Sequence, residues 1–343
     1  MTYRTIRRAG VVTVFVVVLA LVWFTRKVWL LLFAGLLVAL VLTSLINFLK
    51  RLLHVGHKIG LVLALLILAG LATGIVFLVT PTVSGQFAEL SEAIPQRMGE
   101  LRQKINDSVF IQKMNNSVPE ISQPAQGAGA TGGTGGVTKL FTSTFEAASS
   151  FLFILFTGIF AAATPALYRR MVVKLFAPRV RPKAEHTIDR IICTLRHWLL
   201  GQGIAMLVVG IVTGGALAIA GVPFAAALGI VAAFLEFIPV IGPILSAVPA
   251  VLLAFANGLN KVLIVVAIFA GIQFFEGNIL QPIVQKRAID LPPVLTLVAL
   301  LVFGGAFGLL GLFVAAPMTA ALLVLVEDLY LKEYLGTKDR LLE

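Results

Sequence analysis

Two glutamates lie inside long apolar runs of the sequence, where a charged side chain is costly. Glu236 belongs to the run FLEFIPVIGPILSAVPA, and Glu276 belongs to the segment GIQFFEGNILQP. A carboxylate within the hydrocarbon layer of a bilayer costs about 2.5–3.5 kcal/mol on insertion scales, so such residues typically mark a pathway for ions or substrate. The alternative is structural: Glu236 accepts hydrogen bonds from backbone amides freed at a helix break, or it lies near the membrane interface.

Amide side chains surround the second glutamate. Gln273 precedes Glu276 by one helical turn, so the two side chains are expected on the same face of a helix. Asn278 and Gln281 follow within five residues of Glu276. A protonatable Glu276 in a cavity would suit proton coupling. Two alternatives stay open: Asn278 ends the helix, or Glu276 lies at the interface and pairs with the basic residues at 286–287.

Two apolar runs, 223–256 and 293–326, are each about 34 residues long, which is too long for one membrane crossing and short for two. Proline or glycine interrupts each run near its middle, the second within VFGGAFGLLG. Broken helices are tolerated at membrane depth only where protein or a water-filled cavity satisfies the freed backbone groups. The simplest geometry is two re-entrant hairpins that enter from opposite faces, as in secondary transporters; two short full crossings per run are the alternative. The candidate binding residues are therefore Glu236, Pro239, Gly242, Pro243, Gln273, Glu276, Asn278, Gln281, Gly304, Gly305 and Gly308.

The composition indicates an all-α, polytopic membrane protein. Of 343 residues, 59% are hydrophobic and 13% charged, and the mean hydropathy is +1.01, whereas an average soluble domain carries roughly 25% charge. We expect about eight membrane segments, including the two broken hairpins, because each span needs roughly 20 apolar residues. The segments are predicted at 11–24, 28–49, 59–80, 147–168, 198–220, 223–256, 261–281 and 293–326.

Charge distribution sets the predicted orientation. The net charge of +11 comes from short loops between apolar runs, which argues for membrane orientation and against nucleic-acid binding. The basic N-terminus, loop 50–58 and loop 169–197 are expected in the cytoplasm, and 81–146 outside. Both termini are then cytoplasmic. Arg26 and Lys27 fall on the outer side and do not fit this rule.

The chain divides by these segments into six parts. Residues 1–80 form three transmembrane helices, and 81–146 form an outer amphipathic helix followed by a Gly-rich tether. After the span 147–168, the basic segment 169–197 is expected along the inner leaflet, in contact with anionic headgroups. Residues 198–326 form a transport core, and 327–343 a cytoplasmic tail.

Motifs for catalysis, cofactors or metals do not emerge. His54 and His57 lie in a loop without a nearby carboxylate, and no ATP-binding motif occurs. The sequence therefore predicts a protein that is not an enzyme and needs no cofactor, with energy taken from an ion or solute gradient.

The segments EFIPVIGPILSAVPAVLLA, GNILQPIV and GGAFGLLGLFVAAP resemble those of the bacterial autoinducer-2 exporter (AI-2E) family. The resemblance is strong from Gly201 to about Leu325. It implies a homo-oligomeric permease of the bacterial inner membrane with about eight membrane segments. Members are linked to export of the furanone signal autoinducer-2, and others to exchange of sodium or lithium for protons.

Three functions are compatible with the sequence. The leading one is a secondary transporter that exports a small polar solute, such as one like autoinducer-2. The first alternative is a monovalent cation (Na⁺ or Li⁺)/proton antiporter, favoured by two carboxyl groups at membrane depth. The second is a membrane scaffold that uses its outer amphipathic helix for partners and transports nothing.

Overall fold

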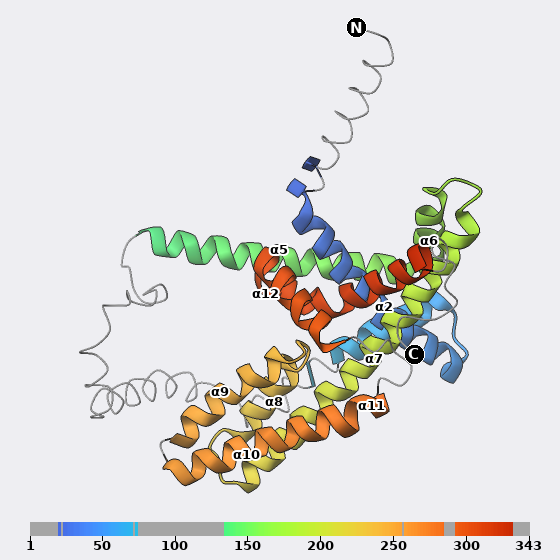
Figure 1. Ribbon diagram of the computed structural model, residues 1–343. Helices are drawn as coiled ribbons and strands as arrows, with labels where there is room; N and C mark the ends of the chain where they lie inside the picture. The colour runs from blue at the N-terminus through green and yellow to red at the C-terminus, as the bar shows by residue number, and fades with distance from the viewer. Residues whose placement is uncertain are drawn as a thin grey trace. The chain divides into compact units, whose positions relative to one another are not determined.

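The computed structural model describes residues 20–21, 23–70, 73–74, 134–255, 257–284 and 292–331. Most of the predicted first span, the outer amphipathic helix, most of the Gly-rich tether and most of the cytoplasmic tail lie outside these residues. The described residues form helices joined by short turns (Figure 1). The all-α class predicted from the sequence is therefore confirmed.

The long helices coincide with most of the predicted spans. Four are long and apolar enough to cross a membrane, or five if a bent pair counts as one span. The described residues thus do not reach the expected number of about eight. In chain order the four are Arg26–Leu53 (α2), Arg181–Ile219 (α7), Leu259–Ile283 and Pro293–Tyr330.

Two of these long helices contain π-helical turns. The span Leu259–Ile283 consists of α10 (Leu259–Phe275), the π-helical turn η1 (Glu276–Leu280) and the start of α11 (Gln281–Val284). The last span consists of α12 (Pro293–Val326) and a second π-helical turn, η2 (Glu327–Leu331). A shorter apolar helix covers His57–Gly70.

Two boundaries differ from the prediction. Helix α5 runs from Thr134 to Ala163, so it begins within the end of the predicted tether and ends before 168. Pro165 then starts α6 (Pro165–Lys174), which bends by 92° from α5. Helix α7 begins at Arg181, so it includes part of the basic segment 169–197 as well as the predicted span 198–220. The apolar pattern locates the membrane span, but the helix can extend beyond the span until a helix-breaking residue ends it.

The chain forms two compact units. Among described residues, one contains α2, α6, α12, η2, most of α5 and α7 up to Arg196. The other contains α7 from His197 on, together with α8 (Ala225–Leu235), α9 (Ile241–Phe255), α10, η1 and α11.

Helices α8 and α9 form the first predicted hairpin. Residues at the start of α8, such as Ala225 and Leu228, share a buried cluster with Leu253 and Ala254 at the end of α9, so the two helices run antiparallel. Helix α10 completes this cluster beside α9 (Figure 1). With 11 and 15 residues, α8 and α9 reach roughly 16 and 22 Å, less than the ~30 Å hydrocarbon core. These lengths favour the re-entrant alternative, which stays a prediction.

The tip of this hairpin is a tight turn. The amide of Ile241 donates to the carbonyl oxygen of Pro239 at 2.7 Å, and Val240 between them has a φ of 67°. This is a γ-turn with positive φ, a rare and strained conformation, more so for a β-branched residue. The next residue, Gly242, packs tightly against the end of α8. A Cβ added to Gly242 would overlap the carbonyl oxygen of Leu235.

The second predicted hairpin is also present as a break. Helix α12 is interrupted at Gly308, where φ is 64° and ψ is −142°, and Figure 1 shows its two arms meeting at an angle. A Cβ on Gly311 would overlap the carbonyl oxygen of Phe303, and one on Gly304 would lie 2.6 Å from Leu312. Residues eight apart touch only if the helix folds back on itself, since they lie about 12 Å apart along a straight helix.

Small residues let helices within each unit approach closely. A Cβ on Gly229 of α8 would lie 2.8 Å from the Gly210 oxygen and 2.8 Å from the Gly214 Cα, both on α7. In the other unit, a Cβ on Gly158 of α5 would lie 2.7 Å from Val38 of α2. Such small-residue contacts are typical of helix pairs in membranes.

Alanine at the two return glycines should destabilise the protein. Gly242→Ala and Gly311→Ala should each lower the free energy of unfolding by about 1–3 kcal/mol, because the added methyl overlaps a carbonyl oxygen. Thermal unfolding of the purified protein in detergent measures the loss. Gly305→Ala is the matched control, since no atom lies within 4 Å of a Cβ at Gly305. Equal melting temperatures for all three variants would show that neither hairpin is packed as described.

Candidate functional site

One face of α7 supports the tip of the α8–α9 hairpin. Trp198 is 3% exposed and meets the ring of Phe237 edge to face, with centroids 5.7 Å apart. One turn later, the side-chain amide of Gln202 donates a hydrogen bond of 2.6 Å to the backbone carbonyl of Glu236. The carbonyl freed at the end of α8 therefore has a partner, as burial at membrane depth requires.

The Glu236 side chain is buried at the end of α8. It is 2% exposed, and its carboxyl group lies next to that of Glu276, close enough for the two groups to interact electrostatically. We call these two residues the carboxyl pair. The second oxygen of Glu236, Oε2, is buried and has no hydrogen-bond partner among the described residues. A buried unsatisfied oxygen is unusual in native proteins and calls for an explanation.

Glu276 lies in a different setting. It is 6% exposed, and each of its two oxygens accepts a hydrogen bond from a glutamine amide. Gln273 donates to Oε2 at 2.8 Å, and Gln281 donates to Oε1 at 3.0 Å. The predicted sharing of one helix face by Gln273 and Glu276 is thus observed.

The π-helical turn η1 explains how Gln281 reaches Glu276. Residues five apart diverge on an α-helix, where neighbours on one face are three or four apart. Here the amide of Gln281 bonds to the carbonyl of Glu276, five residues back, so Gln281 lies over Glu276. Short π-helical insertions occur often at functional sites.

The two halves of the carboxyl pair differ in hydrogen bonding. Two buried carboxylates this close would repel each other strongly, so we expect the pair to hold one proton between the two acids. Glu276 accepts one N–H group at each of its two oxygens. Glu236 accepts none at its free oxygen, so we expect it to carry the shared proton.

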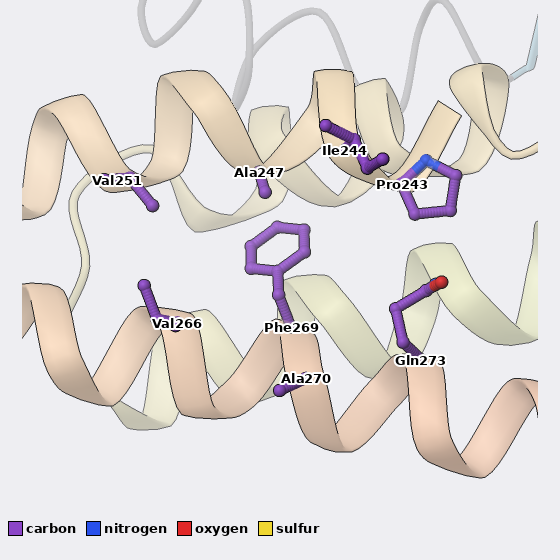
Figure 2. A pocket seen from close by; sticks show the side chains of 8 residues that line it. All are labelled: Pro243, Ile244, Ala247, Val251, Val266, Phe269, Ala270 and Gln273. Atoms are coloured by element: carbon purple, nitrogen blue, oxygen red, sulfur yellow. The ribbon is translucent and has the colours of Figure 1, made fainter. Parts of the chain in front are cut away.

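A groove runs along the neighbouring helix pair, between α9 and α10. Its volume is about 240 Å³. Figure 2 shows Pro243, Ile244 and Ala247 on one wall and Phe269 and Gln273 facing them. Gln273 is the polar residue at one end of this otherwise apolar groove, and its amide also donates to Glu276. The groove is thereby connected to the carboxyl pair through a single side chain.

The structure brings together four of the candidates chosen from the sequence: Glu236, Gln273, Glu276 and Gln281. Pro243 lines the groove, whereas Pro239 and Gly242 shape the hairpin tip. Asn278 does not join the site, because it is exposed and donates at 2.9 Å to the carbonyl of Phe274 in its own helix. Asn278 does not end the helix either.

The remaining candidates belong elsewhere. Gly304, Gly305 and Gly308 lie in α12, which belongs to the other compact unit. The basic residues at 286–287, which were alternative partners for Glu276, lie outside the described residues. The Nε2–H group of His57 donates a hydrogen bond of 3.0 Å to the carbonyl oxygen of Ala162. Across the described residues no cluster of three or more His, Cys, Asp or Glu is placed to hold a metal ion.

Sequence reasoning missed Trp198 and Gln202. The signal for Gln202 was present, since it is an amide residue between two glycines in an apolar run, GQGIAM. Polar side chains at membrane depth are functional candidates for the same energetic reason as carboxylates. The contact between Glu236 and Glu276, 40 residues apart in the chain, had no such signal.

Comparisons with known proteins agree on a family. The family model described as "AI-2E family transporter" matches residues 12–331. Over 302 residues the chain is 27% identical to the putative transport protein YueF of Bacillus subtilis (strain 168), covering 84% of this chain and 82% of that protein. It is 25% identical, also over 302 residues, to the AI-2 transport protein TqsA of Escherichia coli (strain K12), covering 86% and 84%. A shorter match, 35% over 133 residues, covers 39% of this chain and 38% of the putative transport protein YrrI of Bacillus subtilis (strain 168).

The asymmetry of the carboxyl pair predicts an infrared signature. The purified protein should show the carbonyl band of a protonated, water-shielded carboxyl group at neutral pH, and Glu236→Gln should remove it. Glu276→Gln should shift this band but keep it, because Glu236 stays buried. Glu146→Gln, at an exposed glutamate beside Lys27, should leave it unchanged. If the band persisted in Glu236→Gln and disappeared in Glu276→Gln, the proton would be on Glu276 and the prediction would be wrong.

Proposed function

Because the chain belongs to the AI-2E family of transporters, a family of bacterial membrane proteins, we propose that it is a secondary transporter that exports a small polar solute in exchange for protons. Membrane transport is the role common to the family and its named relatives. The solute class and the coupling ion are our inferences for this chain. The scaffold hypothesis receives no support from these relatives.

The carboxyl pair is the observation that carries proton coupling. With one proton, the pair holds the end of α8 against η1 by a hydrogen bond. Without it, two negative charges face each other in a site of low polarity, where repulsion is strong. Loss of the proton therefore favours separation of the α8–α9 hairpin from α10 and η1. A ligand or proton shifts a conformational equilibrium only by binding one state better, and the pair provides that difference.

The groove between α9 and α10 supports a small solute as cargo. A volume of about 240 Å³ suits a molecule of few heavy atoms, and small-molecule sites are mostly apolar with few polar groups. Gln273 lines this groove and donates to Glu276. A solute that accepts a hydrogen bond from the Gln273 amide would remove one of the two hydrogen-bond donors to Glu276. Solute and proton would then influence each other through one residue.

An autoinducer-2-like furanone is the first cargo to test, because the relative TqsA is named an AI-2 transport protein. The second candidate function is Na⁺ or Li⁺/proton antiport. It is favoured by Glu236 Oε2, a buried oxygen without a hydrogen-bond partner next to a second carboxyl group. Hard oxygen ligands of this kind suit alkali cations as well as protons.

We also propose the inner membrane as the location, with both termini in the cytoplasm and the basic loops facing inward. The exposed apolar side chains on the described helices fit contact with lipid or with further copies of the chain. A homo-oligomer stays a proposal that follows from the family resemblance.

Transport measurements on proteoliposomes test the proposal. Vesicles loaded with autoinducer-2 should release it faster when the outside is more acidic, because protons moving in drive the solute out. Glu236→Gln should remove this acceleration, a loss of about 5–150-fold for coupling of ordinary strength. Glu146→Gln is the control and should behave as wild type, because this exposed glutamate is not part of the site.

Two results would contradict the proposal. If the wild-type protein released the solute at a rate independent of the pH gradient, proton coupling would be ruled out. Sodium-driven proton movement without autoinducer-2 release would instead favour the antiporter, and it should then require both Glu236 and Glu276.

A further inference from the structure

Helix α6 follows α5 at an angle of 92° and differs from it in composition. Its sequence PALYRRMVVK carries three cations in ten residues. Such a helix is too charged for the hydrocarbon layer. A basic amphipathic helix that follows a spanning helix at a right angle has the geometry of a helix lying in the membrane interface.

One face of α6 is held by the start of α7. The guanidinium of Arg169 donates to both carboxylate oxygens of Asp189, at 2.8 and 2.6 Å, and lies 2.6 Å from Glu185. Val173, one turn along the same face, is half-buried. Arg169 is therefore neutralised by α7 and is not free for another anion.

The opposite face of α6 is apolar and exposed. Leu167 and Met171 are 53% and 57% exposed, and Leu175 just after the helix is 85% exposed. These residues follow one another at intervals of four and line one side of the helix. Two exposed cations, Arg170 and Lys174, lie along one border of this apolar side.

The turn after α6 keeps Leu175 in place and adds charge. Arg181 donates to the carbonyl oxygens of Phe176 at 3.2 Å and Lys174 at 3.5 Å, which satisfies groups freed at the helix end. Arg179 in this turn is exposed. From Pro165 to Lys183 the sequence has six cations and no acidic residue.

We propose that α6 and the turn that follows it bind the anionic phospholipid surface of the membrane, with Leu167, Met171 and Leu175 in the acyl region and Arg170, Lys174 and Arg179 on the headgroups. Charge complementarity selects this occupant. An apolar strip bordered by cations that form no ion pair within the described part of the chain matches a surface that is apolar inside and negative at its edge. A second copy of the chain would place like charges together, because this segment has no acidic residue to meet them.

Fluorescence quenching in vesicles tests the lipid contact on the full-length protein. A Cys193→Ser, Leu175→Cys variant carries an environment-sensitive label and is reconstituted in phosphatidylcholine with equal fractions of brominated phosphatidylglycerol or brominated phosphatidylcholine. The brominated anionic lipid should quench the label more strongly. Relative affinity for it should fall about fivefold for each of Arg170, Lys174 and Arg179 replaced by glutamine.

The charge-conserving set Arg170→Lys, Lys174→Arg and Arg179→Lys is the matched control and should keep the preference for the anionic lipid. It also separates loss of charge from loss of folding. Equal quenching by the two lipids in the parent protein would overturn the proposal. Quenching of the label by aqueous iodide but by neither brominated lipid would also overturn it. A label that neither lipid nor iodide quenches would overturn it as well, because protein would then cover this face.

Discussion

Each peptide group at membrane depth needs a hydrogen-bond partner, and this requirement shapes both interrupted helices. Where a helix stops, its last carbonyl groups lose their partners. In both breaks the returning arm passes so close to these carbonyls that only glycine fits: Gly242 lies against Leu235, and Gly311 lies against Phe303. The two contacts span seven and eight residues respectively. Two segments without obvious sequence similarity therefore use the same device, a glycine that lets the returning arm approach the end of the first arm.

The close return has consequences for the site. To bring Gly242 against Leu235, the chain must reverse within five residues, and Val240 takes up a γ-turn with positive φ. Such a conformation costs of order 1–3 kcal/mol and persists only where surrounding contacts impose it. Here Trp198 and Gln202 of α7 supply those contacts, through Phe237 and the backbone of Glu236. Helix α7 thus holds the chain at Glu236 and Phe237, just before the turn.

Much of this could be predicted from the sequence, because proline, glycine and buried charge carry strong local signals. The breaks near Pro239 and Gly308 and the shared face of Gln273 and Glu276 were predicted from spacing alone. Tertiary partners were not, since periodicity shows which face of a helix is buried but not what covers it. The carboxyl pair and Gln202 required the fold. Gln281 required the π-helical turn, because on an α-helix it would have pointed away from Glu276. The start of α5 at Thr134 and of α7 at Arg181 went unrecognised because loop composition does not prevent a neighbouring helix from extending.

A pair of carboxyl groups does what a single one cannot. A lone buried glutamate is neutral and inert in an apolar site, since ionisation would leave an isolated charge there. Glu276 differs from Glu236 because both of its oxygens accept glutamine amides. In the proposed mechanism, this hydrogen-bonded partner next to Glu236 makes the binding of a proton or cation at Glu236 favourable. Glu236 ends α8 and Glu276 begins η1. In the proposed mechanism, the presence or absence of one proton or cation between them therefore decides whether these two helical elements hold together, which would link ion binding to movement of the hairpin.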